Sequence, residues 1–114
     1  MIENIGDNFN MPKVTMHKVY DKTSHYRKGN HAPVISRGTV NNETQSIDFT
    51  VHMTPELRNH PVERRVLLAH EKREAAQLAQ GKSVHYAHRV AASQEPEWLK
   101  GEKGYRNIWE RLGH

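Results

Sequence analysis

A small set of ionisable side chains in the second half of the chain has the types and spacing of a metal site. Residues 61–80 carry His70, Glu71 and Glu74, and the apolar residues around them recur at the period of a helix. His70 and Glu74 are four residues apart, so in a helix one lies above the other. Glu71 falls inside the apolar stripe of that helix, where a carboxylate is costly unless a cation or hydrogen bonds compensate.

The next segment supplies the partners of these side chains. Glu74 lies seven residues before Gly81 and His88 lies seven residues after it, so an antiparallel helical hairpin brings the two level. His88 could then meet His70 and Glu74, while Glu95 could orient a ligand from behind. Two imidazoles and one carboxylate suit Zn²⁺, and other divalent transition metals also fit. The residues expected on the packed face of the second helix are Val84, His88, Ala91 and Glu95.

The pattern His70-Glu71-x-x-Glu74 resembles the HExxH helix of the zincin metallopeptidases, with glutamate in place of the second histidine. The resemblance implies that His70, Glu74 and His88 are metal ligands, a set similar to that of the gluzincins in a permuted order. It implies that Glu71 is the catalytic base for a water whose pKa the metal lowers toward about 7. It also implies that residues 47–53 form an edge strand able to pair with an extended peptide.

With Ala87-His88-x-x-Ala91 after the glycine turn, residues 66–95 also resemble small proteins encoded by phages and prophages. This resemblance implies a phage-type, divalent-metal-binding protein that is either a metal-dependent hydrolase or a degenerate one. Two alternatives stay open. The acidic residues and His70 can form a solvated helix face with ordinary ion pairs, and the chain can be a non-enzymatic structural or adaptor protein. Its partner is then another protein or a larger assembly, such as a phage particle or a phage–host complex.

Composition excludes several classes of function. The 114 residues include nine histidines and no cysteine, which excludes disulfides, thiolate metal sites and cysteine nucleophiles. No apolar run approaches the roughly 18 residues of a membrane-spanning helix. The first residues also lack the basic and apolar blocks of a secretory signal. We therefore expect no membrane association and a place in the host cytoplasm or the virion. The net charge of +4 is too small to indicate a dedicated nucleic-acid surface.

Two further groups of residues are candidates for binding. Tyr26, Arg27 and Lys28 combine an aromatic ring with two cations in a turn-rich loop, which suits a phosphate or nucleic-acid contact, although an ordinary polar loop has the same composition. Trp98, Tyr105 and Trp109 belong to an aromatic cluster near the end of the chain. Such a cluster is core if it is buried and a docking surface for a partner if it is exposed.

These residues must be positioned by a small α+β fold. We expect a flexible arm over residues 1–12 and a single domain over 13–114, with strands within 13–53 and helices within 55–112. The strands form a small antiparallel sheet, followed by a helical hairpin and a short C-terminal amphipathic helix. Pro61 should open the long helix and Gly81 should close it, while Ser83 should cap the next helix. The expected strands are 14–20, 34–40 and 46–53, and the expected helices are 61–80, 84–94 and 105–112.

Overall fold

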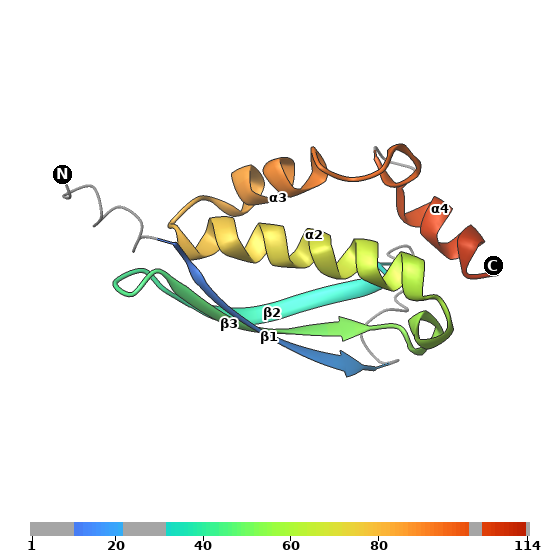
Figure 1. Cartoon of the computed structure of the whole chain (residues 1–114), viewed down its shortest axis with the longest axis horizontal. Coiled ribbons are helices and arrows are strands. Elements are labelled where there is room, and N and C mark those ends of the chain that lie inside the picture. Colours follow the sequence, from blue (N-terminus) through green and yellow to red (C-terminus); the bar gives the residue numbers. More distant parts are fainter. Residues whose placement is uncertain (1–10, 22–31, 101–103, 114) are drawn as a thin grey trace.

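The computed structural model describes residues 11–21, 32–100 and 104–113. Figure 1 shows three tiers: α3 lies over α2, α2 lies over a sheet, and α4 lies beside the first turns of α2. The elements are β1 (Lys13–Tyr20), β2 (Val34–Asn41), β3 (Ser46–Met53), the 3-10 turn η1 (Pro55–Asn59), α2 (Pro61–Ala79), α3 (Val84–Ala92), the 3-10 turn η2 (Glu97–Leu99) and α4 (Gly104–Arg111). This arrangement confirms the α+β class, and the bounds agree closely with those expected from the sequence.

The sheet has the strand order β1-β3-β2, and it corrects two expectations. β2 and β3 form the expected antiparallel hairpin, but β1 runs parallel to β3, so the sheet is mixed. Residues 47–53 belong to the central strand, so the expectation of an edge strand there was wrong. β3 carries four buried apolar side chains on one face, and a strand this apolar takes the position with a neighbour on both sides. The more polar β1 and β2 form the edges.

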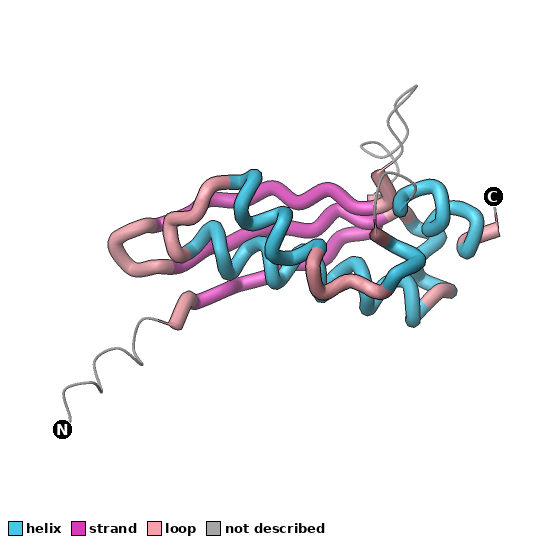
Figure 2. The backbone as a smooth tube through the Cα atoms, turned by 90° about the horizontal axis from the view of Figure 1, so that it is seen from above, coloured by secondary structure: helices cyan, strands magenta, loops and turns pink. Residues whose placement is uncertain are grey.

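The core lies between the sheet and α2. Ile47, Phe49, Val51 and Met53 alternate along β3 and are all buried, as strand geometry predicts for the face that meets a helix. From α2, Leu67, Ala75 and Ala79 face them and are buried as well. Figure 2, seen from above, shows the helices lying over the strands of the sheet. This apolar layer holds α2 in a fixed rotational position, and it therefore decides which α2 side chains face away from the sheet.

The turn between α2 and α3 has the two hydrogen bonds of a Schellman motif. Gly81 has φ +85°, its N–H donates to Leu78 O (3.0 Å), and the N–H of Lys82 donates to Gln77 O (3.1 Å). Ser83 then caps α3, because its Oγ accepts the N–H of Tyr86 at 3.1 Å. Both the glycine stop and the serine cap confirm the sequence prediction. The tight turn returns α3 antiparallel along α2, which is what a metal site shared by the two helices requires.

The C-terminal segment packs against the first turns of α2. Arg111 donates from Nε to Glu63 Oε2 at 2.9 Å, and its guanidinium lies 4.1 Å from the centre of the Trp98 ring. Asn107 donates from Nδ2 to Trp98 O at 2.6 Å. Trp109 is buried and Trp98 packs against the core, so both tryptophans serve the packing of this segment.

Some of the candidates cannot be placed. The side chain of Tyr105 lies outside the part of the chain that the structure describes, and so do Tyr26, Arg27 and Lys28, the candidate phosphate contacts. Among the described residues, no helix is both long enough and apolar enough to cross a bilayer.

Candidate metal centre

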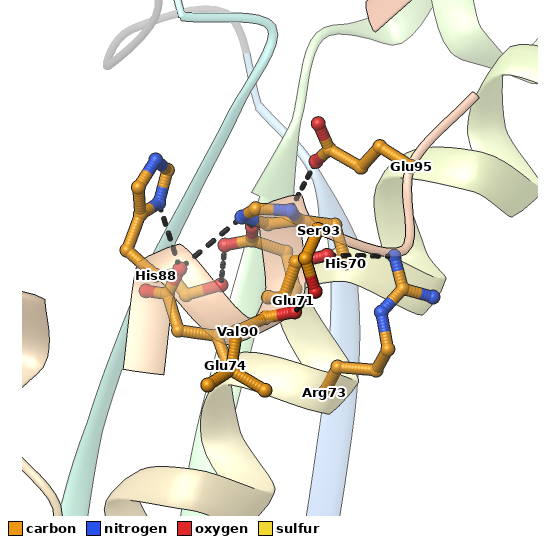
Figure 3. A network of polar contacts seen from close by, with 10 residues as sticks. His70, Glu71, Arg73, Glu74, His88, Val90, Ser93 and Glu95 are labelled. Atoms are coloured by element: carbon orange, nitrogen blue, oxygen red, sulfur yellow. Dashed lines mark hydrogen bonds and ion pairs between the residues drawn. The ribbon is translucent and has the colours of Figure 1, made fainter. Parts of the chain in front are cut away.

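The α2–α3 hairpin brings three candidate ligands to one point. Glu74 Oε2 lies 3.1 Å from His70 Nε2 and 3.1 Å from His88 Nδ1. The two imidazole rings have centroids 5.2 Å apart and meet edge to face. Figure 3 shows the Glu74 carboxylate between the two rings. One ligand atom from each residue lies within 4.8 Å of the others, so these three side chains could hold a metal ion.

The spacing suits a small tetrahedral ion. Zinc binds nitrogen and carboxylate oxygen at about 2.0–2.1 Å, so two ligand atoms of a tetrahedral site lie about 3.3 Å apart. The two distances of 3.1 Å to Glu74 Oε2 are close to that value. The side chain of His88 is 59% exposed, so its ring has room to turn without disturbing the core. The donor set and its spacing are therefore compatible with a divalent transition metal such as zinc.

Glu95 lies on the other side of the His70 ring. Its Oε1 contacts His70 Nδ1, and both side chains are 8% exposed (Figure 3). A carboxylate behind a histidine holds the Nδ1 proton and leaves Nε2 directed at the ligand. Glu95 therefore lies beside the ring that it was expected to orient, and the orienting role stays a prediction. A neutral His70 ring with its proton on Nδ1 has no proton on Nε2 to donate to Glu74. A hydrogen bond from Nε2 to Glu74 therefore requires a ring that carries two protons.

The surroundings of His70 favour a positive charge at this place. Burial by itself lowers the pKa of His70, but the hydrogen bond to Glu74 and the negative charges of Glu95, Glu71 and Glu74 outweigh it. The pKa of His70 is therefore raised above its ordinary value of 6.5. A doubly protonated ring would present one N–H to Glu74 and the other to Glu95. A divalent ion on Nε2 would supply the same positive charge, so protons and metal compete for this atom.

Glu71 and Glu74 of α2 have opposite pKa shifts. Burial raises the pKa of Glu74, but hydrogen bonds from His70 and His88 lower it further, so the carboxylate is ionised at neutral pH, as a ligand must be. Burial is also the main influence on Glu71, and it raises the pKa of that carboxyl above 4.5 even though Ser36 Oγ donates to Oε1 at 2.6 Å. Glu71 Oε2 lies 3.7 Å from His70 Nε2. A carboxylate with a raised pKa beside the ligands suits a general base.

A pocket of about 270 Å³ opens beside Glu71 and Glu74, between α2 and the β2–β3 hairpin. Gly38 lies in its wall, where a Cβ would stand 2.4 Å from both Asp48 O and Phe49 Cβ. The strand can pass this close to β3 only because residue 38 has no side chain. Sequence reasoning missed the pocket and the Ser36 contact, although a serine and a glycine on the inward face of a strand were an available signal. The apolar lining of the pocket consists of Val40, Ile47, Phe49, Ala75, Leu78 and Val84.

Two sequence expectations about the hairpin need correction. Val84 is 68% exposed, so it does not pack between the helices, and the buried contacts of α3 come from Ala87 and Ala91 instead. These two alanines lie where α3 packs on α2. The solvated-face alternative also fails for His70, which is only 6% exposed. Arg73 of the same helix donates from Nη2 to Ala91 O at 3.2 Å, across the helix pair.

No protein-family model, no curated protein and no solved structure matches this chain. The resemblances to zincins and to phage-encoded proteins therefore stay predictions, and the case for this site depends on its own geometry and electrostatics.

Proposed function

We propose that this chain is a divalent-metal-binding protein in which His70, Glu74 and His88 hold a zinc ion. The observation that carries the proposal is the position of Glu74 Oε2, 3.1 Å from one nitrogen of each histidine, with Glu95 behind the buried ring. Three carboxylates surround two imidazoles here, and a divalent cation offsets that excess of negative charge. Adjacent helices of a bundle commonly build metal sites from inward-facing histidine and glutamate in this way.

We further propose that the site is zincin-like and supports hydrolysis by water. A bound zinc ion supplies Lewis acidity and lowers the pKa of water in its open position toward about 7. Glu71 accepts the proton, because burial raises its pKa and Ser36 fixes one of its two oxygens. The adjacent pocket offers an apolar surface for part of a substrate. The phage-type setting belongs to the same proposal and has the sequence resemblance as its support.

Elemental analysis tests the metal site. The untagged protein, dialysed against metal-free buffer and then loaded with zinc, should retain close to one equivalent. His88→Ala should lose it. His85→Ala is the matched control, because His85 is an exposed histidine three residues away on the same helix. Failure of the wild-type protein to retain any transition metal, with no change in melting temperature on zinc addition, would overturn the proposal.

Hydrolysis is tested separately with Glu71→Gln. This variant should retain zinc, since Glu71 is not one of the three ligands, but it should lose cleavage of a quenched fluorescent peptide mixture. The expected loss is about 10²-fold or more, the usual contribution of a general base. If the zinc-loaded wild-type protein cleaves no faster than Glu71→Gln, the site binds metal without this chemistry, and the hydrolase part of the proposal fails.

A further inference from the structure

The outer edge of β1 has backbone groups ready to pair. The N–H groups of Lys13 and Asp21 point inward and bond to Gln45 O and Met53 O beside β3. Because backbone direction alternates along a strand, the even-numbered residues Val14, Met16, Lys18 and Tyr20 direct their N–H and C=O groups away from β3. No strand pairs with this edge within the described ranges 11–21, 32–100 and 104–113. An edge of this kind is a template for one more strand.

A groove of about 360 Å³ runs beside this edge. Its apolar surface comes from Met16 of β1 and from Pro61, Leu68 and Ala69 of α2. Arg65 and Lys72 of α2 also line it. They are seven residues apart, so they are separated by about 10.5 Å along the helix axis. Arg65 and Lys72 thus stand on either side of the apolar residues Leu68 and Ala69 along the helix.

These cations are available to a partner. Arg65, Lys72 and Lys18 are exposed, and no acidic side chain in the described part of the chain forms an ion pair with them. Arg64, in contrast, is already engaged, since its Nη1 donates to Tyr20 Oη at 3.2 Å and to the carbonyl oxygen of Arg58 at 3.2 Å. The groove is also separate from the metal centre, because that centre contacts β2, the strand at the opposite edge of the sheet.

We propose that an extended acidic peptide segment of a partner protein binds here as a fourth strand beside β1. Alternate side chains of such a strand face α2 and are about 6.7 Å apart. An apolar residue over Leu68 and Met16 therefore has its two inward neighbours about 13 Å apart, within side-chain reach of Arg65 and Lys72. The preferred sequence is acidic-x-apolar-x-acidic. Backbone pairing provides affinity and the alternate side chains provide specificity.

Binding is tested with fluorescein-labelled Thr-Glu-Thr-Leu-Thr-Glu-Thr and the full-length protein. Anisotropy should show saturable binding below about 1 mM, and the peptide with lysine in place of both glutamates should bind at least about tenfold more weakly. In the protein, the double variant Arg65→Glu, Lys72→Glu should reverse this preference. The matched control is Lys82→Glu, Arg89→Glu, an exposed lysine and arginine with the same spacing elsewhere on the surface, and it should leave the preference unchanged.

Strand addition has its own signature. Two versions of the glutamate peptide, N-methylated on alternate sets of amides, should differ by tenfold or more, because only one set faces β1. The amide signals of Val14, Met16 and Lys18 should shift on peptide binding in NMR spectra. Equal binding of the acidic and basic peptides, equal effects of the two methylation patterns, or no binding at about 1 mM would each overturn the proposal. Displacement of the peptide by oligothymidine at equal concentration would also overturn the proposal, since the cations would then be binding the phosphate groups of a nucleic acid.

Discussion

The two faces of α2 have different contents, although they belong to the same helix. The face toward the sheet presents Leu67, Ala75 and Ala79 to an apolar layer. The face toward α3 presents His70 and Glu74, with small alanines opposite them. The first face has the composition that burial of apolar surface requires. The second face places ionisable groups where they lose water, an arrangement that lowers stability unless a proton or a metal compensates.

This difference indicates a division of roles within the fold. The sheet and α2 form the stable part, and α3 packs chiefly on α2 and carries one of the three candidate ligands. Zinc and protons should therefore change the stability contributed by the contact between α2 and α3, which we call the α2–α3 seam. They should leave the stability contributed by the apolar layer unchanged. The four predictions below test that separation, and they run from the largest expected effect to the smallest.

Truncation in the apolar layer should have the largest effect. Leu67→Ala removes a side chain that is 2% exposed and should lower the free energy of unfolding by about 2–5 kcal/mol. Equilibrium urea unfolding measures the loss, which should be the same with EDTA and with zinc. Val62→Ala, on the exposed side of α2, is the control and should change stability by less than about 0.5 kcal/mol. If zinc restored the unfolding free energy that Leu67→Ala loses, the two faces of α2 would not have separate roles.

Truncation of His88, at the contact between α2 and α3, should change the metal-free stability little and should abolish the stabilisation by zinc. His88 is mostly exposed, so His88→Ala should change the metal-free unfolding free energy by no more than about 0.5 kcal/mol. The stabilisation by zinc at a hundred times its Kd, about 2.7 kcal/mol in the wild-type protein, should disappear. Thermal unfolding with and without zinc measures both quantities, and His85→Ala should keep the full zinc effect. A His88→Ala protein that zinc still stabilises would remove His88 from the ligand set.

The seam should also respond to pH in opposite directions with and without metal. The pKa of His70 is raised on folding, so its contribution is complete below about 6.5 and is lost as the pH rises through the higher folded value. The raised pKa of Glu71 acts in the same direction from a lower starting pH. The metal-free protein should therefore lose stability as the pH rises above about 6.5. Zinc stabilisation should grow over that range, because deprotonated imidazole binds metal.

Melting temperatures across that range, in EDTA and in zinc, check this prediction. Parallel curves in the two conditions would contradict competition between protons and metal at His70. The carboxylate of Glu74 adds a separate effect at low pH. Its pKa is lowered on folding, so its stabilising contribution is present above about 4.5 and is lost as the pH falls through the lower folded value.

The smallest effect should come from the cap of α3. Ser83→Ala removes the acceptor for the Tyr86 N–H and should cost about 1 kcal/mol. Because α3 carries His88, zinc affinity should fall as well, by less than the loss in His88→Ala. Calorimetric titration with zinc measures the affinity, and Ser83→Asp, which keeps an acceptor, should restore it. Unchanged affinity in Ser83→Ala would mean that the first turn of α3 does not position the site.

The features that follow from neighbouring residues were predictable. Glycine at residue 81 and serine at residue 83 end one helix and begin the next for reasons contained within a few residues, and β3 shows its buried face by simple alternation. The contact between Glu74 and His88 was also predictable, because a short turn forces two consecutive helices to pack side by side. The period of each helix then decides which residues meet.

Contacts between distant segments depended on the tertiary structure. The parallel pairing of β1 with β3 joins residues about thirty positions apart, and no local pattern indicates a partner strand or its direction. That pairing makes β3 central and β1 an edge with a basic groove beside it, and it leaves β2 to bring Ser36 against Glu71. The sequence by itself determined the helices, their turn and the residues that lie beside His70, because these depend on short-range backbone geometry. The sheet order, the pocket beside Gly38 and the contact of Ser36 with Glu71 arose only when the apolar face of β3 packed against α2.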